Sequence, residues 1–398
     1  MMQKLDAFNF KNETILLRVD YNVPLDKNFN VTDCSRIEGT LDTIHRLLKD
    51  DAKIVLITHL GRPEKGVGNK YSLKNILETV ENVLGKKIIF LENLFSTSTK
   101  ERIEHAPWGT IFLLENIRYY PEETEGDLQF AGRLAQLGTF YINDAFGTAH
   151  RAHASTCTIA QYFPTKKCFG LLMQKEIDAV EKILQNAEKP FLAIIGGAKI
   201  SSKITIIETL LDKVDAIIIG GGMAFTFLVA KGYQVGKSLI EENYITIAKN
   251  ILEQSKAKNT KIYLPVDFIT TETFSNETKL SEHSIANMPT DEMGLDIGSA
   301  SVMLFKEHIL ASKTILWNGP MGVFEFSNFQ NGTLNIANFI IEATEKKGAY
   351  SLVGGGDSVA AIKQFNLEDK VSYVSTGGGA LLEYLEGKIL PGIQAILN

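Results

Sequence analysis

Two histidines and an arginine lie close together in one short stretch of the chain. His150, Arg151 and His153 fall within NDAFGTAHRAHAS (143–155), next to the apolar run TFYIND (139–144). A guanidinium is a planar, two-point donor that matches phosphate or carboxylate oxygens, and imidazole nitrogens add further hydrogen bonds. The stretch therefore indicates an anion-binding loop.

Similar clusters follow three other runs that we predict to be strands, in RVDYNVP (18–24), HLGRP (59–63) and ENIRYYP (115–121). They contribute Arg18, Asp20, Asn22, His59, Arg62 and Arg118, and Arg36 begins the first helical segment. Loops at the carboxyl ends of parallel strands share one edge of a sheet, where ligands bind. We expect a pocket for a small, highly anionic molecule with a hydroxyl. Arg18 and His153 could instead only brace the other cations.

Glycines take the place of the arginines in the second half. The stretches are GGAKISSK (196–203), GGGMAF (220–225), NGPMGVFE (318–325), GGGDS (354–358) and TGGGA (376–380). Glycine lets backbone N–H groups approach an anion, and a helix N-terminus adds a favourable dipole. With Lys199, Lys203 and Asp357 beside them, the glycines favour a nucleotide and a divalent cation. Asp357 is the best Mg²⁺ ligand, unless it is only a helix N-cap.

The elements that position these residues alternate between strand and helix patterns. Apolar runs at 14–19, 53–59, 86–91, 110–116 and 139–144 are separated by helical periodicity, as at 36–48, and Ser72 is expected to be an N-cap. A long amphipathic helix, 171–189, follows with no strand before it. Further runs at 191–197, 215–222, 261–267, 314–319, 350–356 and 371–379 restart the alternation.

This order predicts an α/β fold with two Rossmann-like lobes, each a parallel sheet covered by helices. We place the lobes at 1–170 and 190–384, the connecting helix and hinge at 171–189, and a tail at about 385–398 that packs back on the first lobe. All the arginines lie in the first 151 residues; Arg46, Arg102 and Arg133 sit inside helical patterns.

The composition is that of an ordinary globular protein. The chain has 398 residues, 44% hydrophobic and 22% charged, with a net charge of -6, which argues against nucleic-acid or acidic-membrane binding. No run approaches the length of a membrane span and MMQKLDAFNF does not resemble a signal peptide, so we expect a cytoplasmic location. Cys34, Cys157 and Cys168 form no CxxC pair and indicate neither a disulfide framework nor a zinc site.

Common nucleotide fingerprints are absent from the sequence. GYQVGKS (232–238) has three residues instead of four between its glycines and follows no predicted strand, so it is not a Walker A loop. No strict GxGxxG follows a strand, which disfavours a dinucleotide fold, and no HRD or DFG triplet supports a protein kinase.

Over essentially its full length the sequence resembles the phosphoglycerate kinase family. The motifs RVD-N-P, HLGRP, NDAFGTAHRAH, GGAK, GGGMAFTF, LPVDF, WNGPMGVFE, GGGD and STGGGA occur in the family's order. The resemblance implies a monomeric glycolytic kinase that bends at a hinge and transfers a phosphoryl group between 1,3-bisphosphoglycerate and MgADP. Residues 1–170 would bind phosphoglycerate and 190–384 the nucleotide.

The same resemblance implies roles for individual residues. The phosphoglycerate site would contain Asp20, Tyr21, Asn22, Arg36, His59, Leu60, Gly61, Arg62, Arg118, His150 and Arg151. The nucleotide site would contain Lys199, Lys203, Gly220, Gly294, Leu295, Asn318, Glu325, Gly354, Gly355, Gly356, Asp357 and Ser358. Arg36, Lys203, Gly356 and Gly379 would be catalytic, and Asp357 would bind Mg²⁺. Because the attacking oxygen is already phosphate or carboxylate, no general base is required.

Three positions depart from the commonest family pattern. Tyr21 replaces Phe, Ser202 stands where a carboxylate is frequent, and Ser358 replaces Thr. Loss of a carboxylate at Ser202 would alter how Lys203 is oriented. Alternatives are another ATP-dependent small-carboxylate kinase, a nicotinamide oxidoreductase, and a non-catalytic nucleotide-binding protein; the last would be expected to lack Arg36, Lys203 or Asp357.

Overall fold

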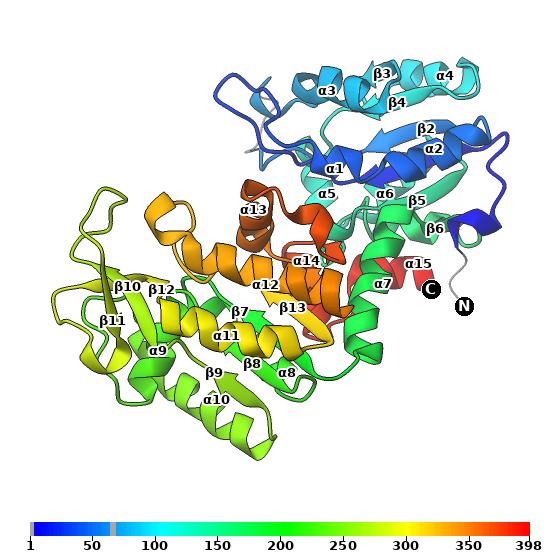
Figure 1. Ribbon diagram of the computed structural model, residues 1–398. Coiled ribbons are helices and arrows are strands. Elements are labelled where there is room, and N and C mark those ends of the chain that lie inside the picture. The colour runs from blue at the N-terminus through cyan, green and yellow to red at the C-terminus, as the bar shows by residue number, and fades with distance from the viewer. Residues whose placement is uncertain (1–3, 64–68) are drawn as a thin grey trace. The chain divides into compact units, whose positions relative to one another are not determined.

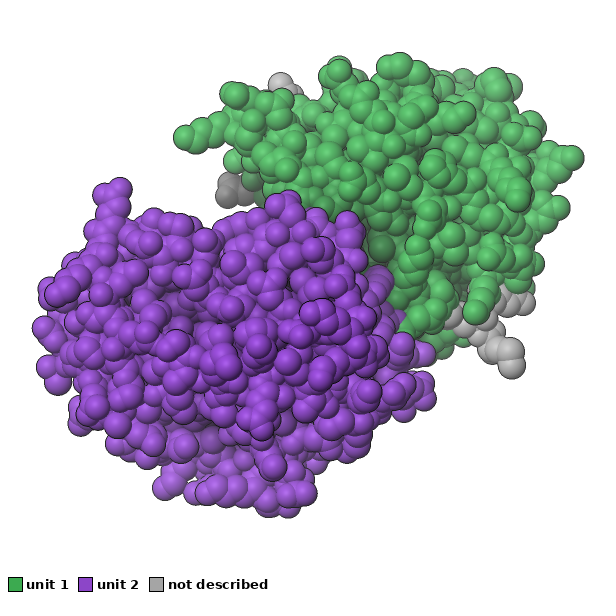
Figure 2. Space-filling view, viewed as in Figure 1, with its two compact units in different colours: residues 1–178, 389–398 green, residues 179–388 purple. Residues whose placement is uncertain are grey.

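The computed structural model describes residues 4–63 and 69–398, and the chain divides into two compact units. Unit 1 comprises the described residues up to Asp178 together with Ile389–Asn398, and unit 2 comprises Ala179–Lys388 (Figure 2). Each unit has its own hydrophobic core. No described helix is long and apolar enough to cross a membrane.

Unit 1 is built on a six-stranded parallel sheet of order β3-β4-β2-β1-β5-β6. Its strands are β1 (Thr14–Val19), β2 (Lys53–Ile57), β3 (Ile88–Leu91), β4 (Ile111–Leu114), β5 (Phe140–Asp144) and β6 (Lys167–Phe169). Its helices are α1 (Ser35–Glu38), α2 (Leu41–Lys49), α3 (Lys74–Leu84), α4 (Thr97–His105), α5 (Pro121–Glu125), α6 (Leu128–Ala135) and α15 (Pro391–Leu397). Strand order reverses between β1 and β5, so the loops after them meet at the switch point where such sheets bind ligands.

Unit 2 contains a second six-stranded parallel sheet, of order β15-β14-β13-β7-β8-β9. Its strands are β7 (Phe191–Ile195), β8 (Ala216–Ile219), β9 (Lys261–Tyr263), β13 (Thr314–Asn318), β14 (Tyr350–Val353) and β15 (Tyr373–Val374). Its helices are α8 (Ile204–Leu210), α9 (Met223–Ala230), α10 (Ile245–Ala257), α11 (Ser299–Ala311), α12 (Asn331–Lys347), α13 (Gly356–Gln364) and α14 (Gly379–Leu385) (Figure 1). The predicted α/β fold with two parallel sheets is confirmed.

A small antiparallel sheet in unit 2 was not predicted. It consists of β10 (Asp267–Thr271), β11 (Ser281–Ser284) and β12 (Met293–Ile297), in the order β11-β10-β12. The run 261–267 does not form the single strand predicted; it divides between β9 in the parallel sheet and the first residue of β10. Pro265 lies at the division, and proline cannot donate a hydrogen bond to a sheet ladder.

Several expected boundaries are wrong. The segment 36–48 is two helices, α1 and α2, because the Thr40 hydroxyl donates to the carbonyl of Ile37 (2.8 Å) between them. Ser72 is not the N-cap residue of α3, although its Oγ accepts from the amide of Lys74 (3.2 Å). The helix after residue 170 does follow a strand, β6, whose three residues are too few to show a period.

The long helix α7 (Leu171–Asn186) supplies residues to both units. At the other end of the chain, α15 belongs to unit 1. The amide of Gly392 donates to the carbonyl of Ala149 (2.8 Å), and Lys167 Nζ donates to the carbonyl of Ala395 (2.9 Å). The C-terminal segment is therefore bonded to the loop that follows β5.

A buried carboxylate fixes the start of α11 in unit 2. Asp267 accepts from the amides of Ala300 and Ser301, both at 2.8 Å. We predict that Asp267→Ala lowers the free energy of unfolding of unit 2 by about 2 kcal/mol, since two buried donors lose their acceptor. The measurement is urea unfolding followed by the fluorescence of buried Trp317, with Trp108 replaced by Phe. Asp291→Ala, at an exposed position, is the control; equal unfolding curves for the two variants would contradict the prediction.

Candidate functional site

The predicted residues of unit 1 form a cluster of cations around the ends of β1, β2 and β5. Arg18 lies on β1 and is 0% exposed. Its Nε donates to Ser155 Oγ (2.8 Å), its Nη1 donates to the carbonyl of Val19, and its Nη2 lies 3.3 Å from His59 Nδ1. Arg18 is thus held inside the sheet, behind the loop residues.

Asp20 is a carboxylate within this cluster and is 8% exposed. Arg36 Nη1 donates to Asp20 Oδ2, and His59 Nδ1 lies 3.8 Å from Asp20 Oδ1. The pKa of His59 is lowered well below its usual value by burial and by the neighbouring arginines, Arg18 first. His59 is therefore neutral at pH 7 and acts as a hydrogen-bonding group rather than as a cation.

Backbone contacts hold the loops together at this edge. Asn22 Oδ1 accepts from the amide of Gly61 (2.8 Å), and Arg118 Nη1 donates to the carbonyl of Gly61 (2.8 Å). Gly61 has a φ of +60°, and a Cβ there would lie 2.3 Å from the Tyr71 ring, so the loop requires glycine. Leu60 is buried beside it. The hydroxyl of buried Tyr21 bonds Thr40 Oγ1 (2.8 Å), so its ring and hydroxyl serve packing.

An open cavity of about 370 Å³ lies beside these loops and is lined by Arg62, Arg118, Arg151 and His153. Burial and the repulsion of Arg151 and Arg18 lower the pKa of Arg118 to about 10. Burial, and then the same arginine cluster, lowers the pKa of His153 to about 4. Arg151 Nε donates to His150 Nε2 (3.2 Å), so His150 orients an arginine of the cavity. Unbalanced cations of this kind favour a multivalent anion.

The glycine stretches of unit 2 come together at the switch point between β7 and β13. A cavity of about 280 Å³ is lined by Gly196, Gly197, Ala198, Lys199, Ser202, Lys203, Asn318, Gly319, Gly355, Gly356, Asp357 and Ser358. Gly319 has a φ of +104°, and a Cβ there would lie 2.2 Å from the carbonyl oxygen of Gly196. Here glycine is required for the close approach of two backbones.

Side chains around this cavity are fixed by hydrogen bonds. Lys203 Nζ donates to Asn318 Oδ1, and Asn318 Nδ2 donates to the carbonyl of Gly354 (2.7 Å). Ser202 Oγ donates to the carbonyl of Lys199 (2.9 Å), so Asn318, not residue 202, orients Lys203. Ser358 Oγ accepts from the amide of Gly319. Burial lowers the pKa of Lys203, whereas the Asp357 carboxylate acts to raise it.

A second cavity in unit 2, of about 500 Å³, adjoins the first, since Gly197, Ala198 and Asp357 line both. Its other predicted residues are Gly294, Leu295 and Glu325. Its walls also carry Phe225, Leu239, Phe268, Phe274, Met293, Met321 and Val323. An apolar slot with an exposed carboxylate at Glu325 suits a flat ring joined to a hydroxylated sugar.

Most predicted nucleotide residues therefore line one of two adjoining cavities, but Gly220 and Gly354 do not. Gly379, which was predicted to be catalytic, is not among the lining residues either. Gly379 begins α14, and Gly354 accepts from Asn318. The sequence analysis missed the apolar wall, because Phe225 and Phe268 have the pattern of core residues. It also missed buried Glu123, which accepts two hydrogen bonds from Ser155.

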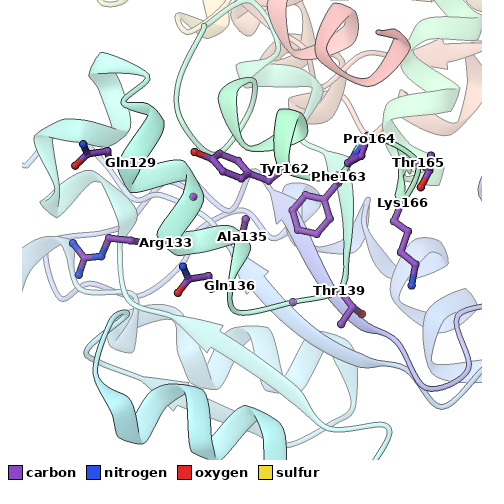
Figure 3. Close-up of a pocket in the computed structure, with 12 residues that line it drawn as sticks. Gln129, Arg133, Ala135, Gln136, Thr139, Tyr162, Phe163, Pro164, Thr165 and Lys166 are labelled. Carbon is purple, nitrogen blue, oxygen red and sulfur yellow. The ribbon is translucent and has the colours of Figure 1, made fainter.

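The structure also contains a cavity that none of the predicted residues lines. It lies on unit 1 between α6 and residues 162–166 and measures about 750 Å³ (Figure 3). Its two cations are engaged elsewhere: Arg133 lies 3.8 Å from the centre of the Phe95 ring, and Lys166 pairs with Glu13 (2.6 Å). The contacts of Arg133 and Lys166 therefore give no indication of an anion-binding site in this cavity.

Comparisons with known proteins agree with one another. A family model described as phosphoglycerate kinase matches residues 5–388. Relatives named phosphoglycerate kinase include that of Porphyromonas gingivalis, 45% identical over 98% of this chain and 99% of the relative. Another, from Thermosipho africanus, is 46% identical over 100% of this chain and 98% of the relative.

Solved structures give the same result. The phosphoglycerate kinase of Coxiella burnetii superimposes with a TM-score of 0.89 at 38% identity, covering 100% of this chain and 99% of that chain. The enzyme of Pyrococcus horikoshii gives a TM-score of 0.86 at 29% identity, covering 100% and 98%.

The lowered pKa of His153 has a consequence for stability. Between about pH 4 and about pH 6.5, His153 is protonated in the unfolded chain but stays neutral in the folded chain. The free energy of unfolding that this residue contributes is therefore lost as the pH falls through that window. We predict that His153→Gln loses less stability than the original chain between about pH 7 and about pH 4.5. Urea midpoints at both pH values measure this, with exposed His105→Gln as the control. Parallel pH profiles for His153→Gln and the original chain would be inconsistent with a neutral, half-buried His153.

Proposed function

The chain belongs to the phosphoglycerate kinase family, and we propose that its unit 1 cluster binds phosphoglycerate while the two unit 2 cavities bind the nucleotide. It is a glycolytic kinase that reversibly transfers a phosphoryl group from 1,3-bisphosphoglycerate to ADP, giving 3-phosphoglycerate and ATP. One observation supports this assignment of the two substrates to the two units. Unit 1 has an arginine-lined cavity, whereas unit 2 has a glycine-lined cavity beside an apolar slot.

The nucleotide assignment follows the chemistry of the two adjoining cavities. The apolar slot, with Gly294 and Leu295 in its wall, takes the adenine, and Glu325 takes the ribose hydroxyls. The smaller cavity takes the phosphates, against Lys199, Lys203 and the start of α13. Because the slot and the phosphate cavity share residues, one nucleotide can occupy both.

The phosphoglycerate assignment rests on the charge of unit 1. Arg62, Arg118 and Arg151 line one cavity and take the phosphate that is not transferred. Asp20 accepts a hydrogen bond from the glycerate hydroxyl, and Asn22 bonds the hydroxyl and carboxylate region. His59 donates a hydrogen bond as a neutral ring. His150 acts through Arg151.

Phosphoryl transfer requires alignment and charge compensation more than covalent help. Arg36 and Lys203 are the side chains that compensate charge on the transferred group, and the amides at Gly356 and Gly379, at the starts of α13 and α14, supply further donors. Arg36 is held by Asp20 and Lys203 by Asn318, so both are oriented before substrate binds. Neither His150 nor His153 is needed as a base.

The residues present fit a magnesium ion that is bound mainly through nucleotide phosphates. Asp357 is an exposed carboxylate in the first turn of α13 and lines both cavities. Among residues 4–63 and 69–398 no group of three or more His, Cys, Asp or Glu side chains could hold a metal by itself. Mg²⁺ bound to Asp357 would neutralise phosphate charge.

We also propose that the enzyme acts in the cytoplasm as a monomer. The three cavities that we assign to the substrates are lined by Arg62, Arg118 and Arg151 in unit 1 and by the glycine stretches in unit 2. A relative from Nicotiana tabacum, 45% identical over 98% of this chain, is named as a cytosolic phosphoglycerate kinase.

A coupled assay of ATP-dependent phosphorylation of 3-phosphoglycerate tests the assignment. We predict activity that chelation of Mg²⁺ abolishes, and none with acetate or carbamate as the acceptor. Asp357→Asn should raise the Mg²⁺ concentration for half-maximal rate by about tenfold or more, because the metal loses its charged protein ligand. Exposed Asp369→Asn is the control. Equal Mg²⁺ dependence of the two variants would remove Asp357 from the metal site.

Arg36→Ala separates transition-state stabilisation from substrate binding. We predict a fall in kcat of about a hundredfold or more, with a far smaller change in KM for 3-phosphoglycerate, since the guanidinium acts mainly on charge that develops during transfer. The comparison is with Arg102→Ala, an exposed arginine on α4. Arg36 has no such role if kcat is retained.

A further inference from the structure

Behind the unit 1 cluster lies a chain of buried polar groups that begins at Glu123. Glu123, on α5, is 1% exposed, and Ser155 and Arg18 are both 0% exposed. Ser155 donates to Glu123 through its amide (2.9 Å, to Oε2) and through its hydroxyl (2.7 Å, to Oε1). Arg18 Nε then donates to Ser155 Oγ (2.8 Å). The three residues form a continuous line from α5 to β1.

The direction of these hydrogen bonds is fixed by Arg18. A guanidinium has donors only, so Ser155 Oγ must accept from Arg18 and direct its own hydrogen to Glu123. An ionised Glu123 accepts both bonds from Ser155. Burial raises the pKa of Glu123, and the charge of Arg18 and the bonds from Ser155 act against that rise. The carboxylate and the guanidinium therefore stabilise one another's charged forms.

The other end of the line reaches His59. Arg18 Nη2 lies 3.3 Å from His59 Nδ1, whereas Asp20 Oδ1, at 3.8 Å, is too distant for a hydrogen bond. Because Arg18 can only donate, His59 Nδ1 must accept, and the ring hydrogen lies on Nε2. The tautomer of His59 is thus set by a residue that is not exposed to solvent.

Charge explains why a carboxylate is needed at the far end. A buried cation without a counter-charge is costly, and a partner that is removed leaves the other member uncompensated. Asp20, the other carboxylate of the cluster, already pairs with Arg36. Glu123 also lies 3.8 Å from His153 Nδ1 through its Oε1, and its charge acts to raise the pKa of Arg118. It is the counter-charge on the buried side.

We propose that Glu123, Ser155 and Arg18 are positioning residues for phosphoglycerate binding. Together they hold His59 as a neutral ring whose single N–H, at Nε2, is available to the substrate. Arg18 thus acts through His59 and is not itself a phosphate ligand. Of the two roles that the sequence left open for Arg18, direct anion binding or support of the other cations, we therefore choose the second. The inference rests on the proposed placement of phosphoglycerate on unit 1.

The test compares Arg18→Met, Glu123→Gln and the double variant. Each single change leaves an unpaired buried partner, so both should lower the urea midpoint of unit 1, and the double variant should recover much of that loss. We expect KM for 3-phosphoglycerate to rise about tenfold or more in Arg18→Met and to stay raised in the double variant, while KM for ATP changes less than about twofold. If Arg18 and Glu123 had a purely structural role, the double variant would regain the original KM for 3-phosphoglycerate together with the urea midpoint.

Lys53→Met is the matched control. Lys53 is also a buried cation of the unit 1 sheet, but it lies at the opposite end of β2 and donates to the carbonyls of Ile103 (2.9 Å) and Glu104 (2.6 Å). It should lose stability with no change in either KM. An equal rise in KM for Lys53→Met and Arg18→Met would overturn the proposal.

Nitrogen-15 NMR of the His59 ring gives a readout that does not depend on activity. The original chain should show one tautomer, protonated at Nε2 and resistant to acid. In Arg18→Met the ring should populate both tautomers and titrate at higher pH, since its nearest cation and its donor are gone. A His59 spectrum that is the same in Arg18→Met and in the original chain would refute the proposed line of hydrogen bonds from Glu123 through Ser155 and Arg18 to His59. If the original chain lacks 3-phosphoglycerate activity, the proposed function fails, while the spectrum still tests this line of hydrogen bonds.

Discussion

A parallel sheet places the carboxyl ends of all its strands along one edge, and both sites depend on this constraint. In unit 1 it collects the loops that carry Asp20, His59 and Arg118, and in unit 2 the loops that carry Gly197, Gly319 and Gly355. In each sheet the strand order reverses at the centre, so neighbouring loops diverge and leave room for a ligand. The backbones of Gly196 and Gly319 approach so closely at this edge that no Cβ fits between them.

We propose that the two units bind anions by different means. Unit 1 uses full charges, and burial followed by the repulsion between these charges lowers the pKa values of Arg118 and His153. Unit 2 uses backbone dipoles and lysines, with Asp357 nearby. A nucleotide arrives with magnesium and so needs less protein charge, whereas phosphoglycerate has no such companion. All the arginines lie before residue 152; Arg18, Arg36, Arg62, Arg118 and Arg151 belong to the unit 1 cluster, whereas Arg46, Arg102 and Arg133 lie on α2, α4 and α6.

The sequence predicted the fold class and the principal clusters, because apolar runs and short motifs record local constraints. It did not predict features that depend on distant residues. β6 and β15 are too short to show a period, and the antiparallel sheet of β10, β11 and β12 follows a strand with no helix between. Phe225 and Phe274 line the apolar cavity of unit 2, but their sequence pattern does not distinguish them from core residues. Glu123 lies in the acidic run PEETEGD, where nothing in the sequence distinguishes a buried carboxylate from its exposed neighbours.

The choice between arginine and lysine follows from burial. Burial and repulsion bring the pKa of Arg118 down to about 10, which still leaves it fully charged at neutral pH. A lysine starts from a pKa about 2 units lower, so a similar shift would bring its pKa to about 8 and leave it partly deprotonated just above neutral pH. Lys203 is tolerated in unit 2 because Asp357 opposes the effect of burial on its pKa, and bound phosphate would oppose it further. Arginine in unit 1 thus keeps the site charged before the substrate arrives, and lysine in unit 2 has its charge reinforced by the ligand it binds.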